Sequence, residues 1–199
     1  MTLGNSASRR DAARLRHVQI RSKAPVLEPA GSPPRFVADV MLGRLAKWLR
    51  IAGFDVLYSN RYEDDELVAL SQQQGRILLS RDTRLLIRRA VRRFIYLESD
   101  DVRDQIVQVL RSTPAAGLPA LLSRCLTCNE PLAELDRESV SDRVPPYVFR
   151  TQSQFKTCPR CRRIYWAGTH RQSVLRTLER LLLESRQPGP SGGSEEDRG

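Results

Sequence analysis

The chain lacks any hydrophobic run close to the roughly 18 residues that a membrane-spanning helix requires. It also lacks the apolar segment that opens a secretory signal peptide. Hydrophobic residues nevertheless make up 40% of its 199 residues, and they gather in separated segments that are typical of a folded core. These features predict a soluble protein without a membrane partner, with room for one α/β domain and one small appendage.

Acidic residues are in short supply. Asp and Glu total 23 against 33 Lys and Arg, which gives a formal net charge of +10. Most of the excess is arginine, whose planar guanidinium group suits phosphate. The charge favours a polyanionic partner such as a nucleic acid, although a basic composition alone is equally compatible with a protein that is merely soluble.

Cysteine is scarce, with four residues in the whole chain. They form two C-x-x-C pairs, Cys125 with Cys128 and Cys158 with Cys161, and each pair can present two thiolates to one tetrahedral Zn²⁺ ion. Two disulfides are the alternative, but this spacing favours a metal and a reducing compartment, which we expect to be the cytoplasm. Because four thiolates leave no open position for water, the predicted zinc is structural and not catalytic.

Composition divides the chain into four predicted segments. Residues 1–34 are rich in Arg, Ser, Ala and Pro and predict a flexible basic arm, with an organellar transit peptide as the alternative. Residues 35–112 form the predicted main domain, residues 120–186 a zinc ribbon with a C-terminal helix, and residues 187–199 a disordered tail. Because the arm is too short for a further catalytic domain, we expect the module to stand alone.

Short apolar strands and amphipathic helices alternate through the main domain. The expected strands cover residues 35–39, 54–58, 76–80 and 94–97, and the expected helices cover residues 41–52, 64–74, 83–93 and 102–110. Short loops join them, which is typical of right-handed crossovers above and below a parallel sheet. The sequence therefore predicts an α/β domain.

Aspartates stand at the ends of the predicted strands. Asp39 ends the first strand, Asp82 follows the third, and Asp64 and Asp65 open the second helix. The carboxyl ends of parallel strands line one crevice, so these acids should converge there and bind Mg²⁺ or Mn²⁺. Each acid could instead cap a helix, but the joint pattern favours a cluster in which metal-activated water cleaves a phosphodiester bond.

Basic side chains close to these acids predict contacts to a phosphate backbone. Arg44, Lys47 and Arg50 recur at three-residue spacing on the first helix, and Arg81 and Arg84 flank the aspartate of the third strand. Cations at such positions orient a nucleic acid without reading its sequence. The alternative is an ordinary solvated helix face.

Aromatic residues follow the second cysteine pair. Tyr165, Trp166 and His170 lie close to several arginines, and aromatic faces interleaved with cations stack unpaired bases. This pattern favours single-stranded RNA as the partner. The alternative is that Tyr165 and Trp166 pack in the small core of the ribbon.

Several segments together resemble a known family. They are FVADVMLGRLAKWLR at 36–50, DDEL at 64–67, RILLSRD at 76–82, CLTCN at 125–129, CPRC at 158–161 and YWAGTH at 165–170. These segments are similar to the Mut-7 carboxy-terminal ribonuclease domain family, whose members join a PIN-like nuclease domain to a zinc ribbon. The resemblance extends from Phe36 to about Leu183.

The resemblance implies a metal-dependent ribonuclease with a PIN-like fold. It places the chemistry at Asp39, at Asp64 or Asp65, and at Asp82, with the ribbon assisting RNA binding. One alternative is a nucleic-acid-binding module with a weak or inactive site. Another is a toxin-like or tRNA-directed nuclease that acts with a protein partner.

The sequence departs from the family pattern at two positions. Ser80 stands where many relatives have Thr, and Arg84 stands where many PIN-like domains carry another acid. A fourth acid would then have to come from elsewhere, and Asp100 or Asp101 is available for that role.

Overall fold

The computed structural model describes residues 33–113, 119–168 and 171–187. Most of the expected N-terminal arm, nearly all of the expected tail, and His170 lie outside these residues. Among the described residues, no helix has the length and apolar character needed to cross a membrane.

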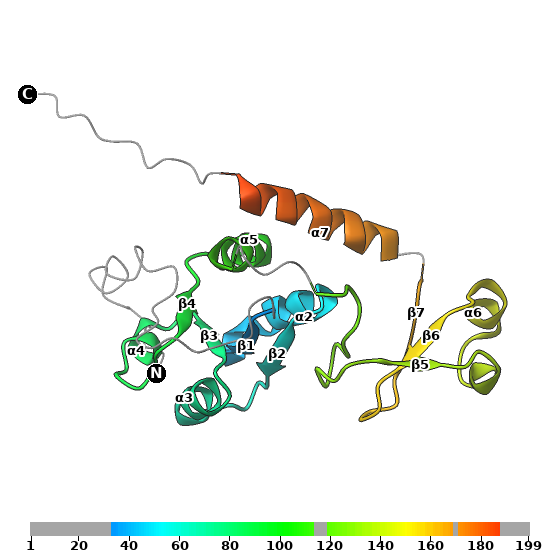
Figure 1. The fold of residues 1–199 in the computed structure, drawn as a ribbon, viewed down its shortest axis with the longest axis horizontal. Coiled ribbons are helices and arrows are strands. Elements are labelled where there is room, and N and C mark those ends of the chain that lie inside the picture. The colour runs from blue at the N-terminus through cyan, green and yellow to red at the C-terminus, as the bar shows by residue number, and fades with distance from the viewer. Residues whose placement is uncertain (1–32, 114–118, 169–170, 188–199) are drawn as a thin grey trace, which may run out of the picture.

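A four-stranded parallel sheet forms the centre of the first domain (Figure 1). Its spatial order is β2-β1-β3-β4. The strands are β1 (Arg35–Ala38), β2 (Asp55–Tyr58), β3 (Ile77–Ser80) and β4 (Phe94–Tyr96). Val37 of β1 pairs with Leu57 of β2 and with Leu78 of β3. The predicted α/β fold with a parallel sheet is confirmed.

Helices cover both faces of this sheet. Neighbouring residues of a strand point to opposite faces, so each apolar strand has side chains to bury on both sides. The helices are α2 (Gly43–Ile51), α3 (Asp64–Gln73), α4 (Thr83–Leu86) and α5 (Val102–Ser112). Phe36 and Leu79 pack in one core cluster with residues of α2 and α5, whereas Val37 and Leu78 pack in another with residues of α3 and α4. Figure 1 shows α2 and α5 on one side of the sheet and α3 on the other.

Helix α4 is much shorter than the helix expected over residues 83–93. It makes one turn, after which Ile87 is exposed and Val91 turns back into the core. Arginines occupy most of the positions that a longer amphipathic helix would have to bury. In addition, the carbonyl of Arg93 accepts a hydrogen bond from the N–H of Leu78 (3.0 Å), so the chain is already extended there. The expected length was wrong for these two reasons.

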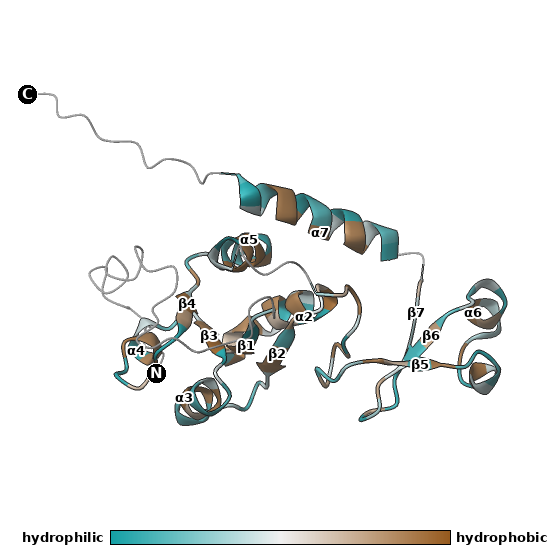
Figure 2. Cartoon of the chain, in the orientation of Figure 1, coloured by the Kyte–Doolittle hydropathy of each residue, from teal (hydrophilic) through white to brown (hydrophobic). Residues whose placement is uncertain are grey.

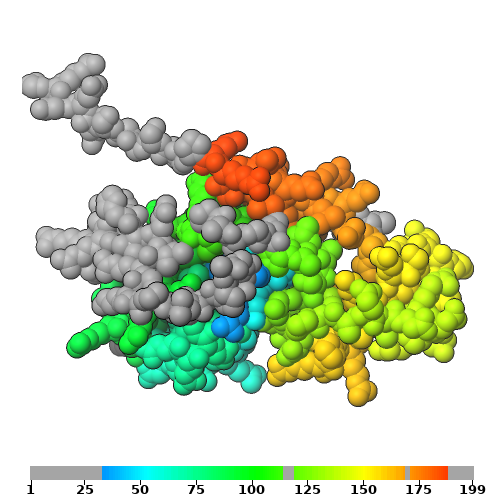
Figure 3. Space-filling view, in the orientation of Figure 1, coloured from blue at the N-terminus to red at the C-terminus, as the bar shows by residue number. Residues whose placement is uncertain are grey.

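A second, antiparallel sheet belongs to the cysteine-rich part of the chain (Figure 1), which forms the right-hand part of the molecule in the space-filling view (Figure 3). Its strands are β5 (Ala133–Leu135), β6 (Phe155–Thr157) and β7 (Ile164–Trp166), in the order β5-β6-β7. Between β5 and β6 the chain forms a short 3-10 helix, η2 (Glu138–Val140), and a helix, α6 (Pro146–Thr151). Val140, Val144 and Phe155 give this excursion its own small core. The excursion accounts for the long stretch between the two C-x-x-C pairs.

The C-terminal helix α7 (Arg171–Arg186) returns to the first domain and packs against α5. Its apolar stripe is visible in Figure 2, and Leu178 and Leu181 of that stripe are buried in the core cluster formed by α2 and α5. Arg111 of α5 also donates to the carbonyl of Glu184 (3.0 Å). The predicted C-terminal helix is therefore present, and it covers the α/β domain.

Candidate metal centres and nucleic-acid interface

The acidic residues expected at the strand ends lie at the switch point of the parallel sheet. From β1 the chain passes to β2 on one side, and it later returns across β1 to β3 on the other. Connections that leave neighbouring strands in opposite directions open a crevice at the carboxyl ends of those strands. Asp39 directly follows β1, and Asp82 follows β3 after one residue, so both side chains lie at this crevice.

Ser80 connects the two loops that carry these acids. Asp39 is buried, with 4% of its surface exposed; its Oδ1 accepts from the N–H of Val40 (2.6 Å) and its Oδ2 accepts from the Ser80 hydroxyl (2.5 Å). The same hydroxyl oxygen accepts from the N–H of Asp82 (2.8 Å). Sequence reasoning treated Ser80 only as a departure from the family. The feature that could have indicated its role is a hydroxyl side chain at the last position of a strand, two residues before an aspartate.

Gly43 leaves room for the Tyr58 side chain beside the turn that follows Asp39. The Tyr58 hydroxyl donates to the carbonyl of Val40 (3.0 Å) and holds the 3-10 turn η1 (Val40–Leu42) that follows Asp39. A Cβ atom at Gly43 would lie 2.6 Å from that hydroxyl oxygen. Any larger residue would therefore push Tyr58 away and release the turn beside Asp39.

Asp39 and Asp82 also cap helices, as the alternative interpretation expected. Asp39 caps η1 through Val40, and Asp82 caps α4 by accepting from the N–H of Arg84 (2.8 Å). A carboxylate has about four acceptor positions, so capping leaves lone pairs free for a cation. The two roles are compatible.

Asp64 and Asp65 have different surroundings at the start of α3. The residue that caps α3 is Glu63, in a capping box with Glu66, so the expectation that Asp64 or Asp65 is the cap was wrong. Asp65 is 85% exposed and pairs with Arg88. Partial burial raises the pKa of Asp64, and the negative charges of Asp82 and Asp39 raise it further.

The charges of Asp82 and Asp39 therefore act on Asp64, as do the charges of Arg88 and Asp65. Among the described residues, the cysteines are the one group of three or more candidate ligands whose ligand atoms all lie within 4.8 Å of one another. Carboxylate oxygens suit Mg²⁺ or Mn²⁺, and such ions keep several water molecules in their coordination shell. Asp101, a candidate fourth acid, caps α5 through Arg103.

The four cysteines lie together, as predicted for a zinc site. Their sulfur atoms lie within 4.8 Å of one another, and the Sγ atoms of Cys125 and Cys161 are 3.7 Å apart. None of the four forms a disulfide, so the disulfide alternative does not apply. Four sulfur donors in this arrangement fit one tetrahedral Zn²⁺ ion.

Each C-x-x-C pair forms the same kind of turn. The N–H of Cys128 points at the sulfur of Cys125 (3.2 Å), and the N–H of Cys161 points at the sulfur of Cys158 (3.5 Å). The residue after each pair has a left-handed backbone, with φ of 67° at Asn129 and 58° at Arg162. Such N–H groups stabilise thiolate charge, so the backbone prepares both pairs to hold a cation.

Tyr165 belongs to the cysteine cluster. Its hydroxyl lies 3.1 Å from the sulfur of Cys125 and accepts from the N–H of Leu126 (3.2 Å). Burial opposes ionisation of Cys125, but hydrogen bonds from Tyr165 and from backbone N–H groups lower the pKa of this thiol to about 6. The position of Tyr165 therefore fits the alternative interpretation, a residue packed inside the ribbon, better than it fits a role in base stacking.

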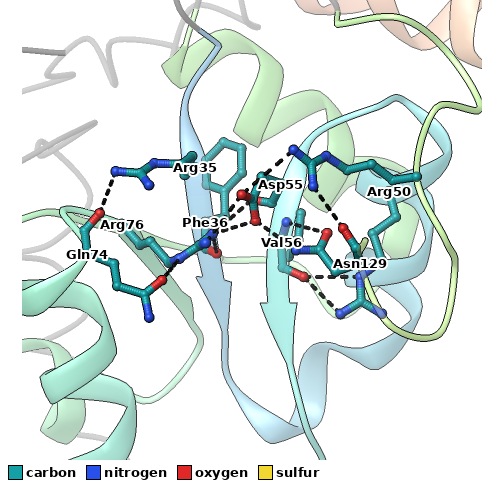
Figure 4. Close-up of polar contacts among 9 residues, drawn as sticks. Arg35, Phe36, Arg50, Asp55, Val56, Gln74, Arg76 and Asn129 are labelled. Carbon is teal, nitrogen blue, oxygen red and sulfur yellow. Dashed lines mark hydrogen bonds and ion pairs between the residues drawn. The ribbon is translucent and has the colours of Figure 1, made fainter. Parts of the chain in front are cut away.

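Arg50 fastens the first cysteine pair to the parallel sheet (Figure 4). Its Nη1 donates to the carbonyls of Leu126 (2.9 Å) and Thr127 (3.1 Å), which lie between the two cysteines. Its Nε and Nη2 donate to the carbonyl of Val56 in β2. Arg50 is 4% exposed, so the expectation that it contacts RNA was wrong.

Asn129 makes the reciprocal connection from the ribbon to β2. Its Oδ1 accepts from the N–H of Val56 (2.9 Å), and its Nδ2 donates to Oδ1 of Asp55 (2.7 Å). Asp55 also pairs with Arg76 (2.6 Å), and although burial opposes it, these hydrogen bonds lower the pKa of Asp55. We call Arg50, Asp55 and Asn129, with their partners, the interdomain latch.

The other predicted nucleic-acid contacts are distributed over the surface. Arg44, Lys47 and Arg84 are exposed and Arg81 is half-buried. Trp166 is 41% exposed and remains available to a base.

A family model described as the Mut7-C RNAse domain matches residues 34–178. The match covers the parallel sheet, both groups of candidate ligands and the first half of α7. No curated protein and no solved structure matches the chain. Because the family model spans well over half of the sequence, the chain belongs to the Mut7-C RNAse domain family.

Proposed function

We propose that this member of the Mut7-C RNAse domain family hydrolyses RNA at Asp39, Asp64 and Asp82 with the help of Mg²⁺ or Mn²⁺. The supporting observations are that Asp39 and Asp82 follow neighbouring strands at the switch point of the sheet, and that their charges raise the pKa of Asp64, which is distant from both in sequence. Repelling carboxylates of this kind are stabilised by a divalent cation. The structural zinc and the catalytic cation would occupy separate places.

In the proposed reaction, water attacks phosphorus, a new P–O bond forms, and the bond to the leaving ester oxygen breaks as that oxygen gains a proton. A divalent cation held there supplies positive charge that favours ionisation of the attacking water and stabilises the leaving oxygen. Ser80 and the Val40 N–H fix the orientation of Asp39. Asp64 is exposed, so its carboxylate faces the side from which RNA can approach.

Cations around the crevice would position the RNA backbone. Arg44 and Lys47 project from α2, which begins just after Asp39, and Arg81 and Arg84 flank Asp82. Their role would be to hold phosphates at the acids, and such contacts carry no sequence information. The ribbon, kept folded by zinc, would extend this surface. Four reduced cysteines suit a reducing compartment such as the cytoplasm.

The two aspartates at the start of α3 provide a matched pair of variants. We expect Asp64→Asn to lower RNA cleavage strongly, because it removes one charge of the coupled cluster, and Asp65→Asn to retain nearly normal cleavage, because Asp65 points to Arg88 instead. Both changes remove one charge from the same helix turn, and Asp65→Asn also removes an exposed ion pair with Arg88 that adds little stability, so neither should lower the melting temperature much. Cleavage rates at saturating Mn²⁺ compare them. Equal rates, or a larger loss for Asp65→Asn, would contradict the assignment of Asp64.

A substrate panel tests the proposed function as a whole. Labelled single-stranded RNA, duplex RNA and single-stranded DNA are incubated with the zinc-loaded protein and Mg²⁺, Mn²⁺ or no added divalent cation, and both binding and cleavage are measured. We expect cation-dependent cleavage of single-stranded RNA. RNA binding without cleavage under every condition would overturn the proposal.

The second candidate function is a nucleic-acid-binding module with an inactive site. It is favoured by Arg84, which stands where many PIN-like domains carry an acid, and because the three carboxylates do not form a group of described residues whose ligand atoms all lie within 4.8 Å of one another. The same panel separates the two functions, since a binding module would retain RNA without shortening it.

A further inference from the structure

A cavity of about 160 Å³ opens where the ribbon meets the α/β domain. Its walls are formed by the stretch leading into the ribbon, the chain around strands β6 and β7, and the start of α7. The residues that line it are Leu121, Leu122, Gln154, Lys156, Tyr165, Trp166, Ala167 and Arg171. None of them belongs to the acidic cluster.

The lining combines an aromatic face with cations and an apolar floor. Trp166 is 41% exposed, and Leu121 and Leu122 pack against the core behind the cavity. Lys156 and Arg171 supply positive charge, and Lys156 is held by Glu134 (3.2 Å). An aromatic ring that is bordered by cations is suited to a flat group linked to an anion, and an unpaired nucleotide has this composition.

The exposed face of α2 leads from the acidic cluster to this cavity. Arg44 stands near the beginning of the helix, close to Asp39, and Lys47 follows one turn later on the exposed side. The helix ends at Ile51, about 10 Å farther along the axis than Arg44. There the carbonyl of Ile51 accepts from the N–H of Leu122 (2.9 Å), which lines the cavity. An RNA strand that follows the exposed side of α2 would therefore reach the end of the helix to which Leu122, one of the lining residues, is hydrogen-bonded.

We propose that this cavity is a nucleobase subsite for the RNA substrate. An unpaired base a short distance from the scissile bond stacks on Trp166, and Lys156 and Arg171 hold the adjacent phosphates. Lys47 and Arg44 guide the intervening backbone to the acids. This inference rests on the proposed function for the identity of the ligand, but it concerns binding and needs no cleavage.

A double-mutant cycle on binding tests the subsite. The affinity of the full-length, zinc-loaded protein for a short single-stranded RNA is measured in magnesium-free buffer without added divalent cation. The RNA is either intact or carries an abasic nucleotide at one position, which is moved along the strand. We expect Trp166→Ala to weaken binding about tenfold or more, and Trp166→Phe to bind nearly as well as the wild type. The matched control is Tyr147→Ala, because Tyr147 is an exposed aromatic residue on α6, outside the cavity.

The cycle identifies the base as well as the protein residue. At one abasic position the loss of affinity should match that of Trp166→Ala, and combining the two changes should add nothing further, since both remove the same stacking contact. Additive losses at every position, or unchanged affinity for Trp166→Ala, would overturn the subsite and leave the cavity to a protein segment. Because no turnover is involved, an inactive acidic cluster would leave this result unaffected. The proposed function can thus fail without the subsite failing.

Discussion

Replacing Asp39 by Asn is expected to reduce RNA cleavage at least about 100-fold, since even the residues behind metal ligands commonly account for about 10–100-fold. Asn has the shape of Asp but no charge, so it weakens the attraction for a divalent cation. It can still accept from the Val40 N–H, a bond that Asp39 makes at 2.6 Å. RNA affinity and the melting temperature should therefore change little.

Asp101→Asn is the matched control for this variant. Asp101 caps α5 by accepting from the N–H of Arg103 (2.7 Å), as Asp39 caps η1, but it is not among the main charges that act on Asp64. Both variants remove one negative charge from a residue that caps a helix. Cleavage by the Asp39 variant at the wild-type rate would contradict the proposed site, and an equal loss in the Asp101 variant would mean either that the effect comes from capping or that Asp101 is the fourth acid.

Removing zinc should unfold the ribbon and also destabilise the α/β domain. Thiolate coordination of structural zinc supplies about 10–16 kcal/mol in small metal-bound peptides, which is comparable with the total stability of about 5–15 kcal/mol of a folded domain. Without zinc, the carbonyls of Leu126 and Thr127 would move away from Arg50, a residue of α2 whose side chain is buried. Nη1 of this charged side chain would then lose both of its partners, which is costly, while Nε and Nη2 would keep the carbonyl of Val56.

Cys158→Ser or chelation at neutral pH should therefore lower the melting temperature of the whole protein. Metal analysis should find one zinc ion per chain in protein purified without chelator, and adding zinc back should restore the structure of the wild type but not of Cys158→Ser. Thr127→Ser serves as the control, because it keeps both the carbonyl that accepts from Arg50 and the hydroxyl that accepts from Arg163. Protein that lacks zinc yet melts normally would contradict a structural zinc site.

Much of the fold follows from local features of the sequence. The alternation of apolar strands with amphipathic helices predicts a parallel sheet, and a parallel sheet brings Asp39 and Asp82 to one edge whatever the loops between them do. The C-x-x-C spacing likewise predicts the cysteine cluster, because two such turns present four sulfur atoms to one ion. These inferences need only the period of each element and the direction of its strands.

Side-chain orientation around a helix could not be predicted so simply. Arg44, Lys47 and Arg50 have equal spacing in the sequence, yet six residues of helix leave Arg50 about 120° away from Arg44. Arg50 therefore faces the protein and Arg44 faces solvent. The choice between Asp64 and Asp65 stayed open for the same reason, since one residue of rotation decides which of them faces the other acids.

The contacts between distant segments also could not be predicted from the sequence. Asn129 is adjacent to a cysteine, but nothing in its neighbours indicates that its side chain pairs with Val56 and Asp55 on a strand edge more than seventy residues earlier. Leu178 and Leu181 predict an amphipathic helix without indicating that α5 covers its apolar face. Such pairings depend on the complete fold.

The central claim is that water, activated at Asp39, Asp64 and Asp82, cleaves the RNA backbone. Single-stranded RNA should be digested by the zinc-loaded protein with Mn²⁺ in water enriched in ¹⁸O, and the product ends should be identified by mass spectrometry. The account predicts linear terminal phosphates that carry one ¹⁸O atom, because the attacking oxygen comes from water. Products that end in a 2′,3′-cyclic phosphate, which forms when the RNA's own 2′-hydroxyl attacks, or RNA that remains intact, would contradict it.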